Sequence, residues 1–161
     1  MLVELFDRLP ALATGYDMSL KVIGSLDLLP DHLVTAAKRA QEATPWGRRR
    51  LTIAMGYGGR QEIVDAAKDL VSELAAEGLS SAEIAARIDS DALAAHMYSA
   101  DMPDPDLLIR TSGESRLSGF LLWQSAYSEF VFVDVNWPAF RHVDFLRALR
   151  DYTGRERRFG Q

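Results

Sequence analysis

Short apolar runs alternate along this chain with longer segments in which apolar residues recur at helical spacing. Strand, helix, strand, helix is the pattern of a parallel sheet covered by helices, so we expect an α/β fold with a mainly parallel central sheet. Strands are predicted at 19–24, 50–55, 106–109 and 129–134. Helices are predicted from the start to about residue 14, from Asp31 as cap to before Pro45, from 60 to Gly78, at 82–88 after Ser80, from Asp89 or Asp91 to Ala95, at 120–123 and at 143–152.

Length and composition limit the classes of protein. With 161 residues and 48% hydrophobic residues, the chain suits one domain spanning residues 1–161. It has no cysteine, and no apolar run approaches the ~20 residues of a membrane span, so we expect a soluble, cytoplasmic protein whose only membrane contact would be peripheral. A net charge of −5 argues against nucleic acid as a partner.

The loop after the third predicted strand carries a concentration of polar groups. Arg110 ends the apolar run, and Arg116 follows six positions later with Glu114 between them. Arginine binds phosphate or carboxylate oxygens in pairs, so two arginines across a turn could converge on one anion, for which a diphosphate is the natural candidate. The alternative is that both arginines lie on the surface and pair with Glu114. Ligands of open α/β sheets bind beyond the carboxyl ends of the strands, where this loop lies.

Other motifs are less specific. Gly56-Tyr57-Gly58-Gly59-Arg60-Gln61 resembles a dinucleotide loop but has Gln61 where glycine or alanine is needed. The three histidines have no metal-ligand spacing, and Asp101, Asp104 and Asp106 are separated by prolines. Glu129, at the head of the fourth predicted strand, could hold a divalent cation or could be a charge at the edge of the sheet.

Several of these segments together resemble the cis-prenyltransferases, the family of undecaprenyl, decaprenyl and short-chain Z-isoprenyl diphosphate synthases. The main one is DLLIRTSGESRLSGFLLWQ at 106–124, followed by AYSE at 126–129. Further matching segments, in the same order as in the family, are 20–24 with 28–30, YGGR at 57–60 with Glu62 and Ile63, NWP at 136–138 and RRFG at 157–160.

The resemblance implies condensation of isopentenyl diphosphate onto an allylic prenyl diphosphate, with magnesium, to form a cis double bond. It places Arg110, Arg116, Leu117 and Ser118 at the isopentenyl diphosphate, with Glu114 orienting the two arginines. Glu129 matches the magnesium ligand. Arg158 and Gly160 match an Arg-x-Gly tail that binds diphosphate across a homodimer, so a homodimer is implied.

The chain also departs from the family. The His-x-Met-Asp-Gly-Asn-x-Arg loop, whose aspartate binds magnesium, does not occur, and neither does a Phe-Ser-x-Glu-Asn-Trp segment. The first predicted helix has no capping residue. We therefore expect a domain without its amino-terminal third, carrying the isopentenyl diphosphate half of the site, with no catalytic residue of its own and inactive alone. The alternatives are a non-catalytic accessory subunit of a heteromeric prenyltransferase and a generic phosphate-binding module.

Overall fold

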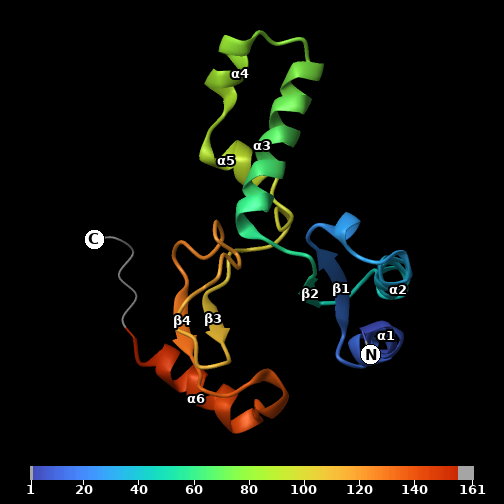
Figure 1. The fold of residues 1–161 in the computed structure, drawn as a ribbon, viewed down its shortest axis with the longest axis vertical. Helices are drawn as coiled ribbons and strands as arrows, with labels where there is room; N and C mark the ends of the chain where they lie inside the picture. The colour runs from blue at the N-terminus through green and yellow to red at the C-terminus, as the bar shows by residue number, and fades with distance from the viewer. Residues whose placement is uncertain (1, 156–161) are drawn as a thin grey trace. The chain divides into compact units, whose positions relative to one another are not determined.

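The computed structural model describes residues 2–155, and the chain divides into two compact units, Met1–Ser99 and Ala100–Gln161 (Figure 1). Each unit is built around a pair of parallel strands. In the first, β1 (Met18–Ile23) pairs with β2 (Arg49–Ala54), and in the second, β3 (Leu107–Arg110) pairs with β4 (Glu129–Phe132). The predicted α/β class with parallel strands is confirmed, and the single domain spanning 1–161 stays a prediction.

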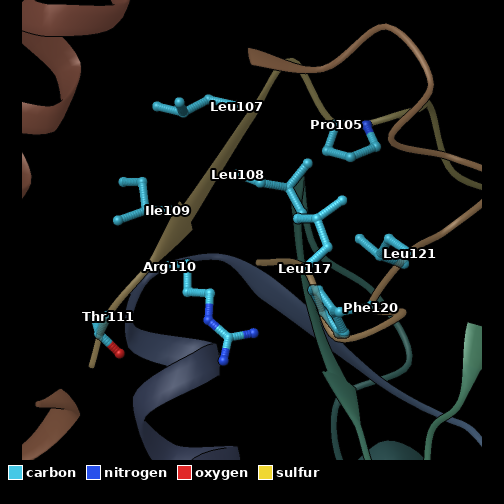
Figure 2. A pocket seen from close by; sticks show the side chains of 9 residues that line it. All are labelled: Pro105, Leu107, Leu108, Ile109, Arg110, Thr111, Leu117, Phe120 and Leu121. Carbon is cyan, nitrogen blue, oxygen red and sulfur yellow. The ribbon is translucent and has the colours of Figure 1, made fainter. Parts of the chain in front are cut away.

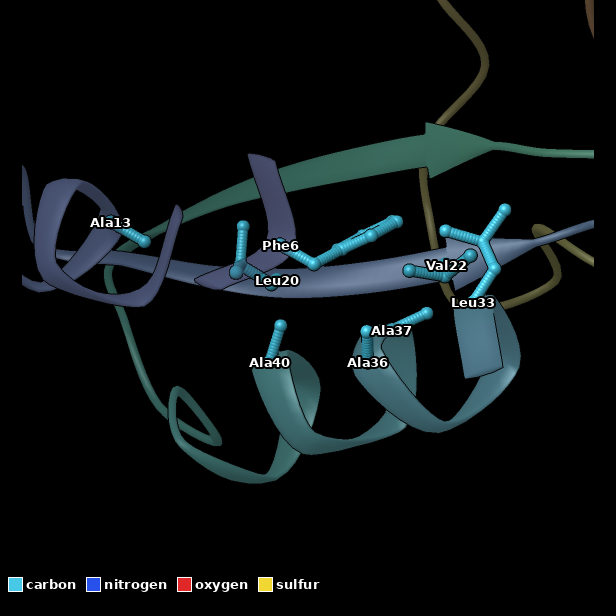
Figure 3. Packing of buried hydrophobic residues seen from close by; sticks show 8 residues of the cluster. All are labelled: Phe6, Ala13, Leu20, Val22, Leu33, Ala36, Ala37 and Ala40. Atoms are coloured by element: carbon cyan, nitrogen blue, oxygen red, sulfur yellow. The ribbon is translucent and has the colours of Figure 1, made fainter. Parts of the chain in front are cut away.

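The core of the first unit lies between β1 and two helices, α1 (Leu2–Gly15) and α2 (Asp31–Glu42). Figure 3 shows the alanines of α2 pointing toward Leu20 and Val22 of β1, beside Phe6 of α1. Alanine side chains are small, so the helix can approach the strand closely. Phe6 is only 2% exposed and supplies much of the apolar volume. The remaining buried members of this cluster are Ala13, Leu33, Ala36, Ala37 and Ala40.

A helical hairpin follows β2 in the first unit. It consists of α3 (Gly59–Ala76), α4 (Ser81–Arg87) and α5 (Ser90–Ala94). The predicted caps are confirmed: the Ser80 hydroxyl accepts from the backbone N–H of Glu83, and the Asp89 carboxylate accepts from that of Ala92. Among the helices that residues 2–155 form, none is long and apolar enough to cross a bilayer.

In the second unit, α6 (His142–Thr153) follows β4 and packs against it, and the buried residues of α6 are Asp144 and Ala148. Short 3-10 turns lie at Leu26–Leu28 in the first unit and at Trp137–Ala139 in the second.

Three local expectations were wrong. Residues 120–123 form successive turns instead of a buried helix, because Ser118, Gly119 and Leu121 have φ values of +50°, +79° and +46°, which no right-handed helix accommodates. Asp31 is the first residue of α2 and makes no capping hydrogen bond, since Pro30 holds the cap position. Pro10 was expected to interrupt the first helix or to kink it. The interruption is wrong, because Pro10 lies inside α1, which runs on to Gly15, and the kink stays a prediction.

Candidate functional site

Strand β3 delivers Arg110 to one side of the sheet. Figure 2 shows Leu107 and Ile109 pointing to one side of the strand and Leu108 and Arg110 to the other. This alternation follows from the two-residue period of a strand. Arg110 is the last residue of β3 and is paired in register with Phe132, so its guanidinium is presented at the carboxyl end of the parallel pair.

The chain then turns sharply into the loop at 111–118. The N–H of Ser112 donates to Val135 O at 2.8 Å, and the N–H of Gly113 donates to Val133 O at 3.2 Å. Both residues have positive φ, +85° and +70°. A Cβ added to Gly113 would lie 2.5 Å from Asp134 Oδ1, so both conformation and space favour glycine there.

Glu114 lies between the two arginines. Its Oε2 accepts from Arg110 Nη2, and its Oε1 accepts from Arg116 Nη2 at 2.6 Å. Arg110 Nη1 also donates to Ser118 Oγ at 3.1 Å. The structure therefore brings together Arg110, Glu114, Arg116 and Ser118, which the sequence predicted as one group, and the pairing with Glu114 is present as well.

The cluster combines a partly buried cation with an exposed one. The side chain of Arg110 is 26% exposed and that of Arg116 is 71% exposed. Arg110 Nε is buried and has no hydrogen-bond partner. Two guanidinium groups around one carboxylate leave a net positive charge, so the cluster can bind an anion with several oxygens.

An apolar cavity of about 430 Å³ lies beside Arg110. Leu108 and Arg110 point to the side on which Leu117, Phe120 and Leu121 lie (Figure 2). The other lining residues are Pro105, Leu107, Ile109 and Thr111. A cavity with apolar walls and one cationic group suits a ligand that has a hydrocarbon part and an anionic part. The sequence singled out Leu117 but not Phe120 or Leu121, which were expected inside a helix.

Glu129 lies away from this cluster. It pairs in register with Leu107, three residues before Arg110, which corresponds to about 10 Å along the strand. Leu107 and Arg110 also point to opposite sides of β3 (Figure 2). The Glu129 carboxylate accepts from Arg155 Nη1 at 2.8 Å, and the same nitrogen donates to the backbone carbonyl of Phe130 at 2.9 Å.

No group of three or more metal-ligating side chains occurs in the part of the chain that the structure describes. Arg158 and Gly160 lie outside the described residues. Arg155 was missed as a partner of Glu129, since the sequence shows only a run of basic residues near its end.

A buried carboxylate that the sequence did not single out for a role supports the glycine-containing loop after β2. Glu62 is fully buried, and it accepts from the hydroxyl of Tyr57 and from the backbone N–H of Tyr98, the latter at 3.0 Å. The Tyr98 hydroxyl donates to Asp65 at 2.6 Å, and this hydrogen bond lowers the pKa of Asp65. Burial raises the pKa of Tyr98. This network fixes the loop at the carboxyl end of β2.

Known proteins resemble this chain over most of its length. Residues 2–160 match the sequence pattern of a family described as putative undecaprenyl diphosphate synthase. Isoprenyl transferase 1 of Corynebacterium diphtheriae is 54% identical over 143 residues, which cover 88% of this chain and 54% of that protein. A short-chain Z-isoprenyl diphosphate synthase of Mycobacterium bovis is 49% identical over 144 residues, covering 89% and 55%. The chain thus spans about half the length of the curated relatives it matches.

Two solved structures share the fold. Lavandulyl diphosphate synthase from Lavandula x intermedia, in complex with dimethylallyl diphosphate, has a TM-score of 0.90 and 32% identity, covering 99% of this chain and 68% of that one. A probable undecaprenyl diphosphate synthase from Campylobacter jejuni has a TM-score of 0.77 and 29% identity, covering 98% and 72%.

Proposed function

Because this chain belongs to the undecaprenyl diphosphate synthase family of cis-prenyltransferases, we propose that it serves the condensation of isopentenyl diphosphate with an allylic prenyl diphosphate to a cis-polyprenyl diphosphate. The part proposed for residues 1–161 is to bind isopentenyl diphosphate. The observation that carries this proposal is the convergence of Arg110 and Arg116 on Glu114, with the Ser118 hydroxyl hydrogen-bonded to Arg110.

The cluster suits a diphosphate for electrostatic and geometric reasons. Each guanidinium can donate to two oxygens at once, and the Ser118 hydroxyl adds a further donor. Glu114 holds the two arginines close together before a ligand arrives, which offsets their mutual repulsion. A diphosphate held in one orientation places the alkenyl group attached to it in a fixed direction, and such positioning favours a reaction between two substrates. The cavity beside Leu117 and Phe120 supplies apolar walls for that hydrocarbon.

Glu129 is the proposed ligand of magnesium. One guanidinium nitrogen, that of Arg155, lies within 3 Å of the Glu129 carboxylate and the Phe130 carbonyl. These are hard oxygen ligands of the kind that Mg²⁺ prefers, and here they already surround a positively charged group, so the donor set fits a divalent cation. When bound, magnesium would neutralise charge on diphosphate oxygens of the allylic substrate, since Glu129 lies about 10 Å along the strand from the Arg110 cluster. A homodimer in which Arg158 and Gly160 reach the diphosphate site of the other copy is proposed from the family resemblance.

The first test is calorimetric titration of the chain with isopentenyl diphosphate. We expect Arg110→Ala to weaken binding at least about tenfold, because hydrogen bonds to charged groups contribute about 1.5–3 kcal/mol each. Arg110→Lys keeps the positive charge but cannot donate two parallel hydrogen bonds. Its affinity for isopentenyl diphosphate should lie between those of the unchanged chain and Arg110→Ala. Arg150→Ala is the matched control: its side chain is 77% exposed on α6, and we expect unchanged affinity.

Circular dichroism should show that each variant keeps its secondary structure. If folded Arg110→Ala binds as tightly as the unchanged chain, this arginine is not in the site. If the unchanged chain binds neither isopentenyl diphosphate nor inorganic diphosphate, the proposed substrate site is refuted and a non-catalytic accessory subunit becomes the better description.

A further inference from the structure

The contact between Arg155 and the start of β4 is more specific than an ordinary surface ion pair. A single nitrogen, Arg155 Nη1, donates to both Glu129 Oε2 and Phe130 O, at 2.8 and 2.9 Å. The side chain of Glu129 is 27% exposed and that of Arg155 is 45% exposed. The cationic group is therefore held between a carboxylate and a carbonyl at a partly buried position.

The strand geometry explains why the two oxygens converge. The N–H of Glu129 donates to Asp106 O on the β3 side of β4. Because successive peptide groups of a strand point to opposite sides, the carbonyl of Phe130 points away from β3, along the outer edge of β4. Arg155, just beyond α6, reaches this edge and satisfies a carbonyl that the β3–β4 pair leaves open.

We propose that Arg155 competes with a divalent cation for the Glu129 carboxylate and the Phe130 carbonyl, so that the metal binds only when the guanidinium leaves. This inference rests on the proposed role of Glu129 as a metal ligand. Mg²⁺ needs its oxygen ligands at 2.0–2.1 Å. A second positive charge held between the same two oxygens would occupy that position and repel the metal. The two cations are thus mutually exclusive.

Displacement of Arg155 also changes the end of α6. Gly154 donates to the carbonyl of Arg150 and closes the helix, and Arg155 follows immediately. When its guanidinium leaves Glu129, Arg155 loses its tie to β4. Metal binding at Glu129 is in this way linked to the position of the Arg155 side chain.

The test uses Mn²⁺, which also prefers oxygen ligands and whose free concentration is measured by electron paramagnetic resonance. The chain is titrated in the presence of inorganic diphosphate. We expect Arg155→Met, which keeps the length of the side chain and removes its charge, to tighten Mn²⁺ binding by about tenfold, the order of magnitude expected when a partly exposed like charge is removed. Glu129→Gln should weaken binding, and the double variant should bind as weakly as Glu129→Gln alone.

Arg150→Met is the matched control, because it changes the net charge of the chain by the same amount and Arg150 lies on α6, shortly before Arg155. We expect its Mn²⁺ affinity to stay within about twofold of the unchanged chain, since its exposed charge is screened by solvent. If Arg150→Met tightens binding as much as Arg155→Met, general electrostatics explains the gain and the competition is refuted.

A second measurement needs no variant. In the unchanged chain, the side-chain ¹⁵N resonance of Arg155 should shift when Mg²⁺ and diphosphate are added, while that of Arg150 should not. A static Arg155 resonance at saturating metal would overturn the proposal.

The metal ligand and the competition for it are tested by different variants. If Glu129→Gln weakens Mn²⁺ binding but Arg155→Met does not tighten it, only the competition is wrong. If Glu129→Gln leaves the affinity unchanged, the proposed metal ligand is wrong and the competition falls with it. Diphosphate binding by the Arg110 cluster is measured separately and survives either result.

Discussion

Two residues at the start of the loop at 111–118, which carries the proposed diphosphate site, have backbone angles that most L-residues avoid. Ser112 and Gly113 have φ values of +85° and +70°, and a Cβ on Gly113 would lie 2.5 Å from Asp134 Oδ1. We expect Gly113→Ala to lower the free energy of unfolding by about 1–2 kcal/mol, from backbone strain and the displaced carboxylate. It should also weaken isopentenyl diphosphate binding, because Glu114 and Arg116 follow directly. Urea denaturation and calorimetry measure the two effects.

Gly154→Ala is the control for Gly113→Ala. Gly154 has an ordinary negative φ of −83°, and the nearest atom to an added Cβ is 3.6 Å away. Its effect on unfolding should stay within about 0.5 kcal/mol. Equal losses in the two variants would show that the loop at Gly113 is not strained by a side chain.

The members of the candidate site could be predicted from the sequence better than their arrangement. Arg110, Glu114, Arg116 and Ser118 lie within nine residues, so one turn necessarily gathers them. The position of Glu129 depends on the register of β4 against β3, which pairs it with Leu107. Register is set by tertiary packing that a single sequence does not display. The Arg155 contact depends in addition on where α6 ends.

At the scale of elements, His96 connects α5 to α3. Its Nδ1 lies 2.8 Å from Ala92 O and its Nε2 lies 2.9 Å from Glu73 Oε2. A neutral imidazole has one N–H, so only the imidazolium donates to both acceptors. The hydrogen bond to Ala92, then that to Glu73, with Asp69 of α3 nearby, raises the pKa of His96 above its usual value of 6.5.

This raised pKa predicts a pH dependence with a definite sign. The folded state binds the proton more tightly than the unfolded state does, so the stabilisation is fully present below about pH 6.5 and is lost as the pH rises through the raised pKa. We expect the urea concentration at the unfolding midpoint to decrease as the pH rises from about 6.5 through the pKa of His96. The contribution of His96 to this decrease should be absent in His96→Gln. It should still be present in His142→Gln, which changes a histidine of the second unit. A pH profile identical in the unchanged chain and in His96→Gln would contradict the prediction.

Helices were predictable where a recognisable capping residue preceded a periodic apolar pattern. Ser80 and Asp89 mark their helices by side chains that accept backbone N–H groups, and the structure confirms both. The run at 120–123 is apolar without being periodic over a useful length, so its composition could not distinguish turns from a helix. The positive φ of Leu121 is imposed by the surrounding fold and has no sequence signature.

At the scale of the whole molecule, the buried apolar cluster of the first unit includes Phe6 of α1 together with residues of β1 and α2. We expect Phe6→Ala to lower the free energy of unfolding by about 3–5 kcal/mol, through lost burial and the cavity left behind. Hydrogen exchange should show reduced protection in α1, β1 and α2. Phe145→Ala is the control: its side chain is 40% exposed on α6, and the loss should be under about 1.5 kcal/mol. Similar losses would mean that Phe6 is not central to this core.

The α/β class followed from the sequence because parallel sheets require helices between strands, and that alternation is visible in the residues. The separation into two strand pairs was not visible. The residues of a strand do not indicate which distant strand it pairs with. The sequence was therefore equally consistent with one sheet of four strands, whereas the structure has the pairs β1-β2 and β3-β4.

The two backbone hydrogen bonds that tie Ser112 and Gly113 to the segment after β4 have a thermodynamic consequence for ligand binding. These bonds fix the main chain at the start of the loop when the protein folds. An anion that binds to the loop would then order side chains and little of the main chain. Conformational entropy lost on binding is therefore confined to arginine rotamers, and the association should show a small heat-capacity change apart from that of the buried hydrocarbon. For the proposed diphosphate ligand, the main chain at the start of the loop is therefore already in place before binding.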